Sequence, residues 1–145
     1  MDRTVLSINL NARTTLRLAE LVMGLAAAVV GLTALYNLLF GPTFVIVRQT
    51  GRVPGSLFDE LHNTGTFPAL LVGFGIVFAV IAISALAHTA SGRNASRIVL
   101  WLATLTLVAL TAIWYFDAGL FFVPGAALAL AACVLSLTWK RAASR

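Results

Sequence analysis

Long stretches without a single charged side chain dominate this chain of 145 residues. Four windows contain no Asp, Glu, Lys or Arg, and they cover residues 21–47, 61–92, 98–116 and 118–139. A helix needs about 20 apolar residues to cross the hydrocarbon core of a bilayer. The chain is 60% apolar and 10% charged, whereas soluble domains are roughly half apolar and about 25% charged. The sequence therefore predicts an all-α integral membrane protein, a bundle of four transmembrane helices formed by residues 1–145 as one domain.

Turn and capping residues set the predicted limits of these spans. Gly41 and Pro42 end the first span, because proline cannot continue the backbone hydrogen-bond ladder. Pro68, preceded by Thr66 as N-cap, and Pro124 fall in first turns, where a missing N–H is harmless. The predicted spans cover residues 18–40, 67–87, 98–116 and 120–139, and an outer loop covers residues 41–66.

Basic residues are distributed unevenly between the two sides of the predicted bundle. Only Arg48 and Arg52 fall on the side of the long loop. The other side carries Arg3, Arg13, Arg17, Arg93, Arg97, Lys140, Arg141 and Arg145. The positive-inside rule then places both termini in the cytoplasm, and we expect a plasma (inner) membrane location. The richness in Arg, Ala, Leu and Val suggests a bacterial source.

The net charge of +5 does not indicate nucleic-acid binding. The basic residues occupy short segments beside the membrane, where contact with anionic lipid head groups accounts for them. Membrane lipids are therefore the expected partners of these charges, and no nucleic acid is expected.

The outer loop, about 26 residues long, is the only sizeable segment outside the spans. Residues 44–47 are β-branched or aromatic and predict an extended segment. Residues 50–55 predict turns. Ser56 and Asp59 resemble a capping box and predict a short amphipathic helix over residues 57–63, lying at the bundle mouth or the lipid interface.

Two polar residues within the first span are candidates for a ligand or proton site. Glu20 lies about one turn from the inner end, where it is interpreted as an interfacial carboxylate paired with Arg17, Arg93 or Arg97. The alternative is a proton or cation site, since ionisable groups inside a membrane are functional by default. Asn37 lies about one turn from the outer end, where it bonds to another helix or caps the loop.

A weak candidate for a metal site lies on the outer side. Asp59, His62 and Asp117, together with Glu60, could converge there, and carboxylates with an imidazole can bind a divalent metal. The competing interpretation is a solvated polar face. His88 lies at the opposite side of the membrane from His62, so the two cannot ligate one haem. No cofactor is predicted.

Small residues recur at four-residue or similar spacing on three of the spans. Such faces permit close helix approach, either inside the bundle or against partner helices. The helix-packing candidates are Gly24, Ala28, Gly31, Gly73, Gly75, Gly125 and Ala129.

These features favour a non-catalytic accessory or structural subunit of a larger membrane complex. The motifs of phosphate-binding loops, dinucleotide sites, zinc proteases and serine hydrolases are missing, so no enzyme is predicted. The partner would be another membrane protein or a second copy of this chain. The alternative is a small transporter or channel for a hydrophobic or lipid-like substrate, acting as a homodimer. A third hypothesis is a membrane enzyme or metal protein that uses Asp59, His62 and Asp117.

Overall fold

The computed structural model describes residues 3–41, 44–48, 51–56, 58, 69–114 and 119–141. Within these ranges, side chains are described for residues 14–41, 55, 56, 58, 71–114 and 119–138. The chain order is α1 (Arg3–Phe40), β1 (Phe44–Arg48), β2 (Gly51–Gly55), α3 (Ala69–Ser91), α4 (Asn94–Ile113), the 3-10 helix η1 (Gly119–Phe122) and α5 (Val123–Arg141).

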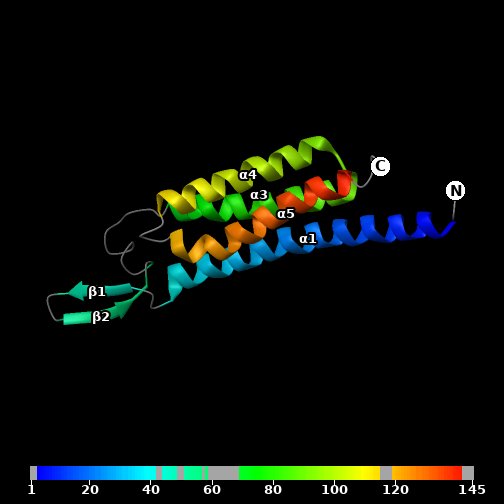
Figure 1. Ribbon diagram of the computed structural model, residues 1–145. Helices are drawn as coiled ribbons and strands as arrows, with labels where there is room; N and C mark the ends of the chain where they lie inside the picture. The colour runs from blue at the N-terminus through cyan, green and yellow to red at the C-terminus, as the bar shows by residue number, and fades with distance from the viewer. Residues whose placement is uncertain are drawn as a thin grey trace.

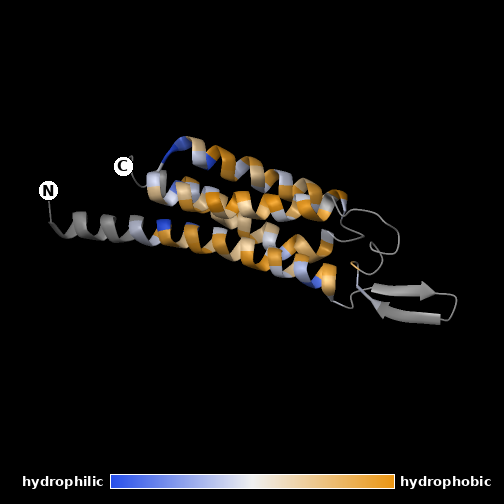
Figure 2. Cartoon of the chain, turned by 180° about the vertical axis from the view of Figure 1, so that it is seen from behind, coloured by the Kyte–Doolittle hydropathy of each residue, from blue (hydrophilic) through white to orange (hydrophobic). Residues whose placement is uncertain are grey.

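Four helical segments are long and apolar enough to cross a membrane. They are Thr14–Phe40, Leu71–Ser91, Asn94–Ile113 and Gly119–Thr138. The predicted bundle of four helices that are long and apolar enough to span a membrane is thereby confirmed. Figure 2 shows the spans as mostly hydrophobic, with strongly polar residues at the turn that joins α3 and α4.

The predicted ends of the first and fourth spans have clear local causes. α1 ends at Phe40, and the Gly41 N–H closes its last turn on the Asn37 carbonyl at 2.8 Å. α5 begins at Val123, so Pro124 lies in its first turn as predicted. α1 begins at Arg3 rather than near residue 18. The arginines before residue 18 interrupt the apolar stretch but not the helix, because arginine is a good helix former.

The helices form a ring in which α1 packs against α3 and α5, and α4 packs against the same two helices. Figure 1 shows the two chain termini at one end of this bundle, with α1 extending past the other helices there. The strands β1 and β2 lie beyond the opposite end. The even number of spans explains why both termini share an end.

The loop after α1 contains an antiparallel hairpin. β1 pairs with β2 in a register that runs from Phe44 opposite Gly55 to Arg48 opposite Gly51. The extended segment predicted for residues 44–47 is present, but the turns predicted for residues 50–55 are replaced by β2. Pro54 fits there because a two-stranded ribbon consists of edge strands, where a missing N–H is tolerated.

Most of the predicted helix over residues 57–63 lies outside the described residues, as do Thr66 and Pro68. Phe58 is described and helical. Its ring lies 5.5 Å from that of Phe40, which in turn lies 5.1 Å from the ring of Tyr36. These three exposed aromatic side chains connect the loop to the end of α1.

The core of the bundle is divided into an apolar half and a polar half. Near the hairpin end, the buried rings of Phe74 and Phe122 stack with centroids 4.2 Å apart, and Phe78 lies 6.0 Å from Phe122. Near the other end, the buried polar side chains are those of Glu20, Ser84, His88, Thr104, Cys133 and Ser136. Aromatic packing therefore closes one half, and hydrogen-bonding groups line the other.

Glycines allow three helices to approach around one phenylalanine. A Cβ on Gly31 of α1 would overlap the Phe78 ring, and a Cβ on Gly125 of α5 would lie 2.9 Å from it. The Phe78 ring of α3 therefore fills the space that both glycines leave. A Cβ on Gly24 would lie 2.5 Å from the Ala85 Cβ.

The remaining small residues differ in their surroundings. Ala28 and Ala129 are buried. A Cβ on Gly75 would contact Leu35 at 3.4 Å, whereas a Cβ on Gly73 would meet nothing within 4 Å. Gly73 therefore faces open space outside the described part of the bundle.

A single glycine makes the tight connection between α3 and α4. Gly92 has a φ of 65°, in the left-handed region that glycine adopts without steric cost. Its N–H bonds to the His88 carbonyl at 2.7 Å, which is the backbone bond of a left-handed helix C-cap. This cap fixes the last turn of α3, the turn that carries His88.

Candidate functional site: a buried carboxylate–imidazole pair

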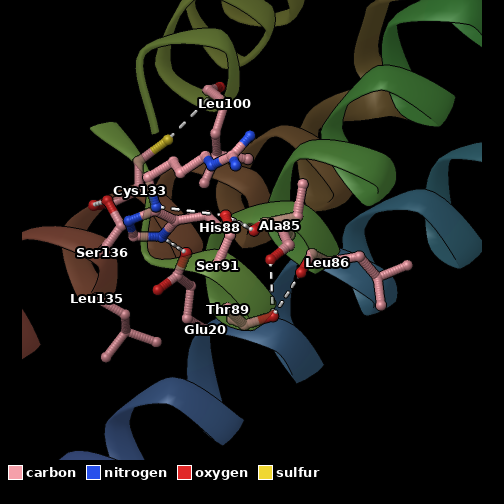
Figure 3. Close-up of polar contacts among 12 residues, drawn as sticks. Glu20, Ala85, Leu86, His88, Thr89, Ser91, Leu100, Cys133, Leu135 and Ser136 are labelled. Atoms are coloured by element: carbon pink, nitrogen blue, oxygen red, sulfur yellow. Dashed lines mark hydrogen bonds and ion pairs between the residues drawn. The ribbon is translucent and has the colours of Figure 1, made fainter. Parts of the chain in front are cut away.

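Glu20 and His88 meet inside the bundle, although 68 positions separate them in the sequence. His88 Nδ1 lies 2.6 Å from Glu20 Oε1, and both side chains are 0% exposed. Figure 3 shows the two side chains pointing toward one another from α1 and α3. The distance suits a hydrogen bond with the proton on either atom, and the ring can donate from Nδ1 as a neutral tautomer or as an imidazolium.

The third helix near this pair contributes Cys133. Its Sγ donates to Thr104 Oγ1 at 3.3 Å and lies 3.8 Å from the Leu100 carbonyl oxygen. One turn further along α5, Ser136 Oγ donates to the Cys133 carbonyl at 2.6 Å. Polar contacts therefore join α1 to α3 through Glu20 and His88, and α5 to α4 through Cys133 (Figure 3).

The threonines of α4 have three different environments. Thr106 is exposed and donates to the Leu102 carbonyl of its own helix at 2.9 Å. Thr104 is instead the acceptor for the Cys133 thiol. Thr111 Oγ1 is buried with no hydrogen-bond partner among the described residues. The polar contacts therefore stop before the half of the core that contains Phe74 and Phe122.

The environment of Glu20 differs from the sequence interpretation. Its carboxylate is completely buried instead of interfacial, and it bonds to His88, a partner that the sequence interpretation did not include. Arg17, one turn earlier on α1, is exposed. The alternative interpretation of Glu20, as a proton or cation site, therefore gains the buried setting that it requires.

His88 is the site residue that sequence reasoning did not identify. It occupies the last turn of α3, three residues before Ser91, so it lies about 4.5 Å from the end of that helix. The available signal was its position at the same end as Glu20, since α1 and α3 run in opposite directions. Predicting the pairing also requires knowing how each helix is rotated about its axis. A nearly uniform apolar pattern does not determine this rotation.

The other predicted site residues do not join this pair. Asn37 is exposed near the opposite end of α1, where its backbone carbonyl accepts the Gly41 N–H. Asp59, His62 and Asp117 lie outside the described residues. Within the described ranges, no group of three His, Cys, Asp or Glu side chains could hold a metal ion.

The chemistry available to the pair is the holding and movement of a proton. An oxygen of Glu20 and a ring nitrogen of His88 are close enough to share one, and burial excludes the water that would compete for it. No protein-family model, curated protein or solved structure matches this chain.

Proposed function

We propose that this chain is a non-catalytic subunit of a larger complex in the plasma membrane of a bacterium, with both termini in the cytoplasm. The observation that carries the proposal is the division between interior and exterior. The described interior is closed in one half by the rings of Phe74, Phe78 and Phe122. The outward faces are apolar on all four helices, so lipids and the helices of another protein are the partners that fit them.

A face scan tests this proposal directly. One exposed aliphatic residue on each helix is replaced by tryptophan, which adds bulk outside the bundle and leaves its interior unchanged. Suitable positions, all more than half exposed, are Val29 on α1, Ile76 on α3, Leu102 on α4 and Val134 on α5. Each tagged variant is extracted from its native membrane in polymer-bounded lipid discs, and the co-purified proteins are quantified.

The expected result is one stoichiometric partner for the original chain and its loss in the variants of one or two neighbouring helices. The variants that keep the partner serve as matched controls, because they carry the same kind of substitution on another helix. A homogeneous homo-oligomer without a second protein contradicts the proposal. So does a partner that survives all four substitutions.

The second candidate function is a small transporter for a hydrophobic or lipid-like substrate, acting as a homodimer. The observation that favours it is the buried Glu20–His88 pair, because coupling to protons requires ionisable groups inside the membrane. The Glu20→Gln variant is compared with Glu60→Gln, the only other glutamate, in cells exposed to a panel of hydrophobic toxicants. Proton coupling predicts loss of resistance in Glu20→Gln alone, and equal resistance in both variants rules it out.

A further inference from the structure

The Glu20–His88 pair has a chemical property that a non-catalytic subunit does not require. Both side chains are fully buried and 2.6 Å apart, so neither ion is solvated by water. Counted from a carboxylate beside a neutral imidazole, one added proton makes the pair neutral overall, whether it resides on the carboxyl or on the imidazole. A second proton, taken from water, would occupy the remaining basic atom and leave the pair with a charge of +1.

The charged and titratable groups around the pair are unequally placed. On α1, Arg17 lies one turn away and is exposed. At the start of α4, Arg97 is half-buried and Arg93 is exposed. On α5, the described titratable group is the buried thiol of Cys133. The fixed charges among these described side chains are thus positive and lie at the end of the bundle where α3 meets α4.

The polarity of the core determines from which end a proton could arrive. His88 lies in the last turn of α3, directly before the Gly92 connection, and Ser91 beside it is exposed. In the opposite direction, the core contains the stacked rings of Phe74 and Phe122. Water or hydroxyl groups can carry a proton across a short polar distance at the first end, whereas the stacked rings separate the pair from Thr111, the buried hydroxyl described in the aromatic half.

We propose that Glu20 and His88 form a proton-binding site that exchanges protons with solvent only at the α3–α4 end of the bundle. The site holds one proton between Glu20 Oε1 and His88 Nδ1 and gains a second when that solvent becomes acidic. This role is independent of the proposed subunit function, and the test below requires no partner.

The composition of the chain makes the site directly observable. It contains two glutamates, Glu20 and Glu60, and two histidines, His62 and His88. The full chain, labelled with ¹³C in glutamate and ¹⁵N in histidine, is reconstituted into lipid vesicles and titrated by solid-state NMR. The Glu60→Gln and His62→Gln variants assign the signals, because each removes the other residue of its kind and leaves the pair unchanged.

We expect the Glu20 carboxyl and His88 imidazole signals to change together in the transition at which the second proton binds, since each macroscopic step of interacting groups belongs to the pair. Glu20→Gln should abolish that transition at His88. Constant signals over the pH range in which the chain stays folded would overturn the proposal, because a structural ion pair gives that result. A transition in which one of the two signals changes without the other would also overturn it. The measurement on the unmodified chain remains decisive even if Glu20→Gln fails to fold.

The direction of exchange is tested in vesicles that contain the chain in one orientation. The pH is changed on one side at a time, and the orientation is determined by labelling a Ser91→Cys variant with a membrane-impermeant maleimide. A transition driven only from the side of Ser91 is expected. A transition driven from the hairpin side, or equally from both sides, contradicts the closed aromatic half of the core.

Discussion

At the residue scale, the stability of the bundle depends on keeping the Glu20–His88 pair complete. Removing one partner leaves a buried polar group whose lost hydration is no longer compensated. We therefore expect Glu20→Ala to lower the free energy of unfolding by about 3–5 kcal/mol. The measurement is unfolding in a denaturing detergent, followed by tryptophan fluorescence or circular dichroism.

Two further variants separate the loss of the pair from the loss of packing. Glu20→Gln keeps the volume and a hydrogen-bonding group, so its effect should be smaller than that of Glu20→Ala. The double variant Glu20→Met with His88→Leu removes both polar groups at similar volume and should be neutral or stabilising by about 1–4 kcal/mol. A double variant as unstable as Glu20→Ala would show that packing, and not the pair, holds α1 against α3.

The pair also shows where sequence reasoning reaches its limit. Glu20 could be singled out because it is an acid within an otherwise apolar span. Its partner could not, because His88 and the three nearby arginines were all compatible with the same end of the bundle. Choosing among them requires knowing how α1 is rotated relative to α3. This rotation is set by contacts such as the one between Gly24 and Ala85.

At the scale of elements, the packing of α1, α3 and α5 depends on one ring between two glycines. Gly31→Ala adds a methyl group where the Phe78 ring already lies, so α1 must move away from α3. We expect this variant to be destabilised by about 1–3 kcal/mol, the usual cost of overpacking a core. The same unfolding assay measures it.

Gly73→Ala is the matched control, because it makes the same chemical change on α3 where a Cβ meets nothing within 4 Å. Alanine favours helix by up to about 1 kcal/mol over glycine, so stability should be unchanged or slightly raised. Equal losses for both variants would disprove the interlocking of Phe78 with Gly31.

The connection between α3 and α4 provides a second test at this scale. Gly92 has a φ of 65°, which costs a residue with a Cβ roughly 1–2 kcal/mol. Gly92→Ala should therefore destabilise the chain by about 1 kcal/mol, and Gly92→Asn by less, because asparagine tolerates this conformation. Thermal unfolding of the two variants should rank them in that order, and a reversed order would contradict the C-cap.

The elements also differ in how far the sequence predicts them. The spans follow from the charge-free windows because a bilayer imposes a minimum apolar length. The hairpin does not, because Gly51, Pro54 and Gly55 are turn residues by propensity, and only pairing with β1 makes them a strand. The extension of α1 to Arg3 was missed because hydropathy predicts the length of the membrane-spanning part of a helix and not the length of the whole helix.

At the scale of the whole molecule, the two ends of the bundle differ in polarity. The Glu20–His88 pair, the α3–α4 connection and both chain termini lie at one end, and the aromatic half of the core and the hairpin lie toward the other (Figure 1). Among the described side chains, the arginines Arg17, Arg93 and Arg97 lie at the end of the termini. The proton-binding site would therefore communicate with the same compartment as the termini.

This difference between the ends makes a prediction about topology that single cysteines can test. The unmodified chain is the blank, because its one cysteine, Cys133, is fully buried. Gly51→Cys in β2 should react with a membrane-impermeant maleimide in intact cells, since the positive-inside rule places the hairpin outside. Ser91→Cys, exposed at the opposite end, should react only after the cells are permeabilised. The reverse pattern would place the Glu20–His88 end outside, where a proton-binding site would respond to external acidity instead of the cytoplasm, and labelling of both variants in intact cells would indicate a mixed orientation.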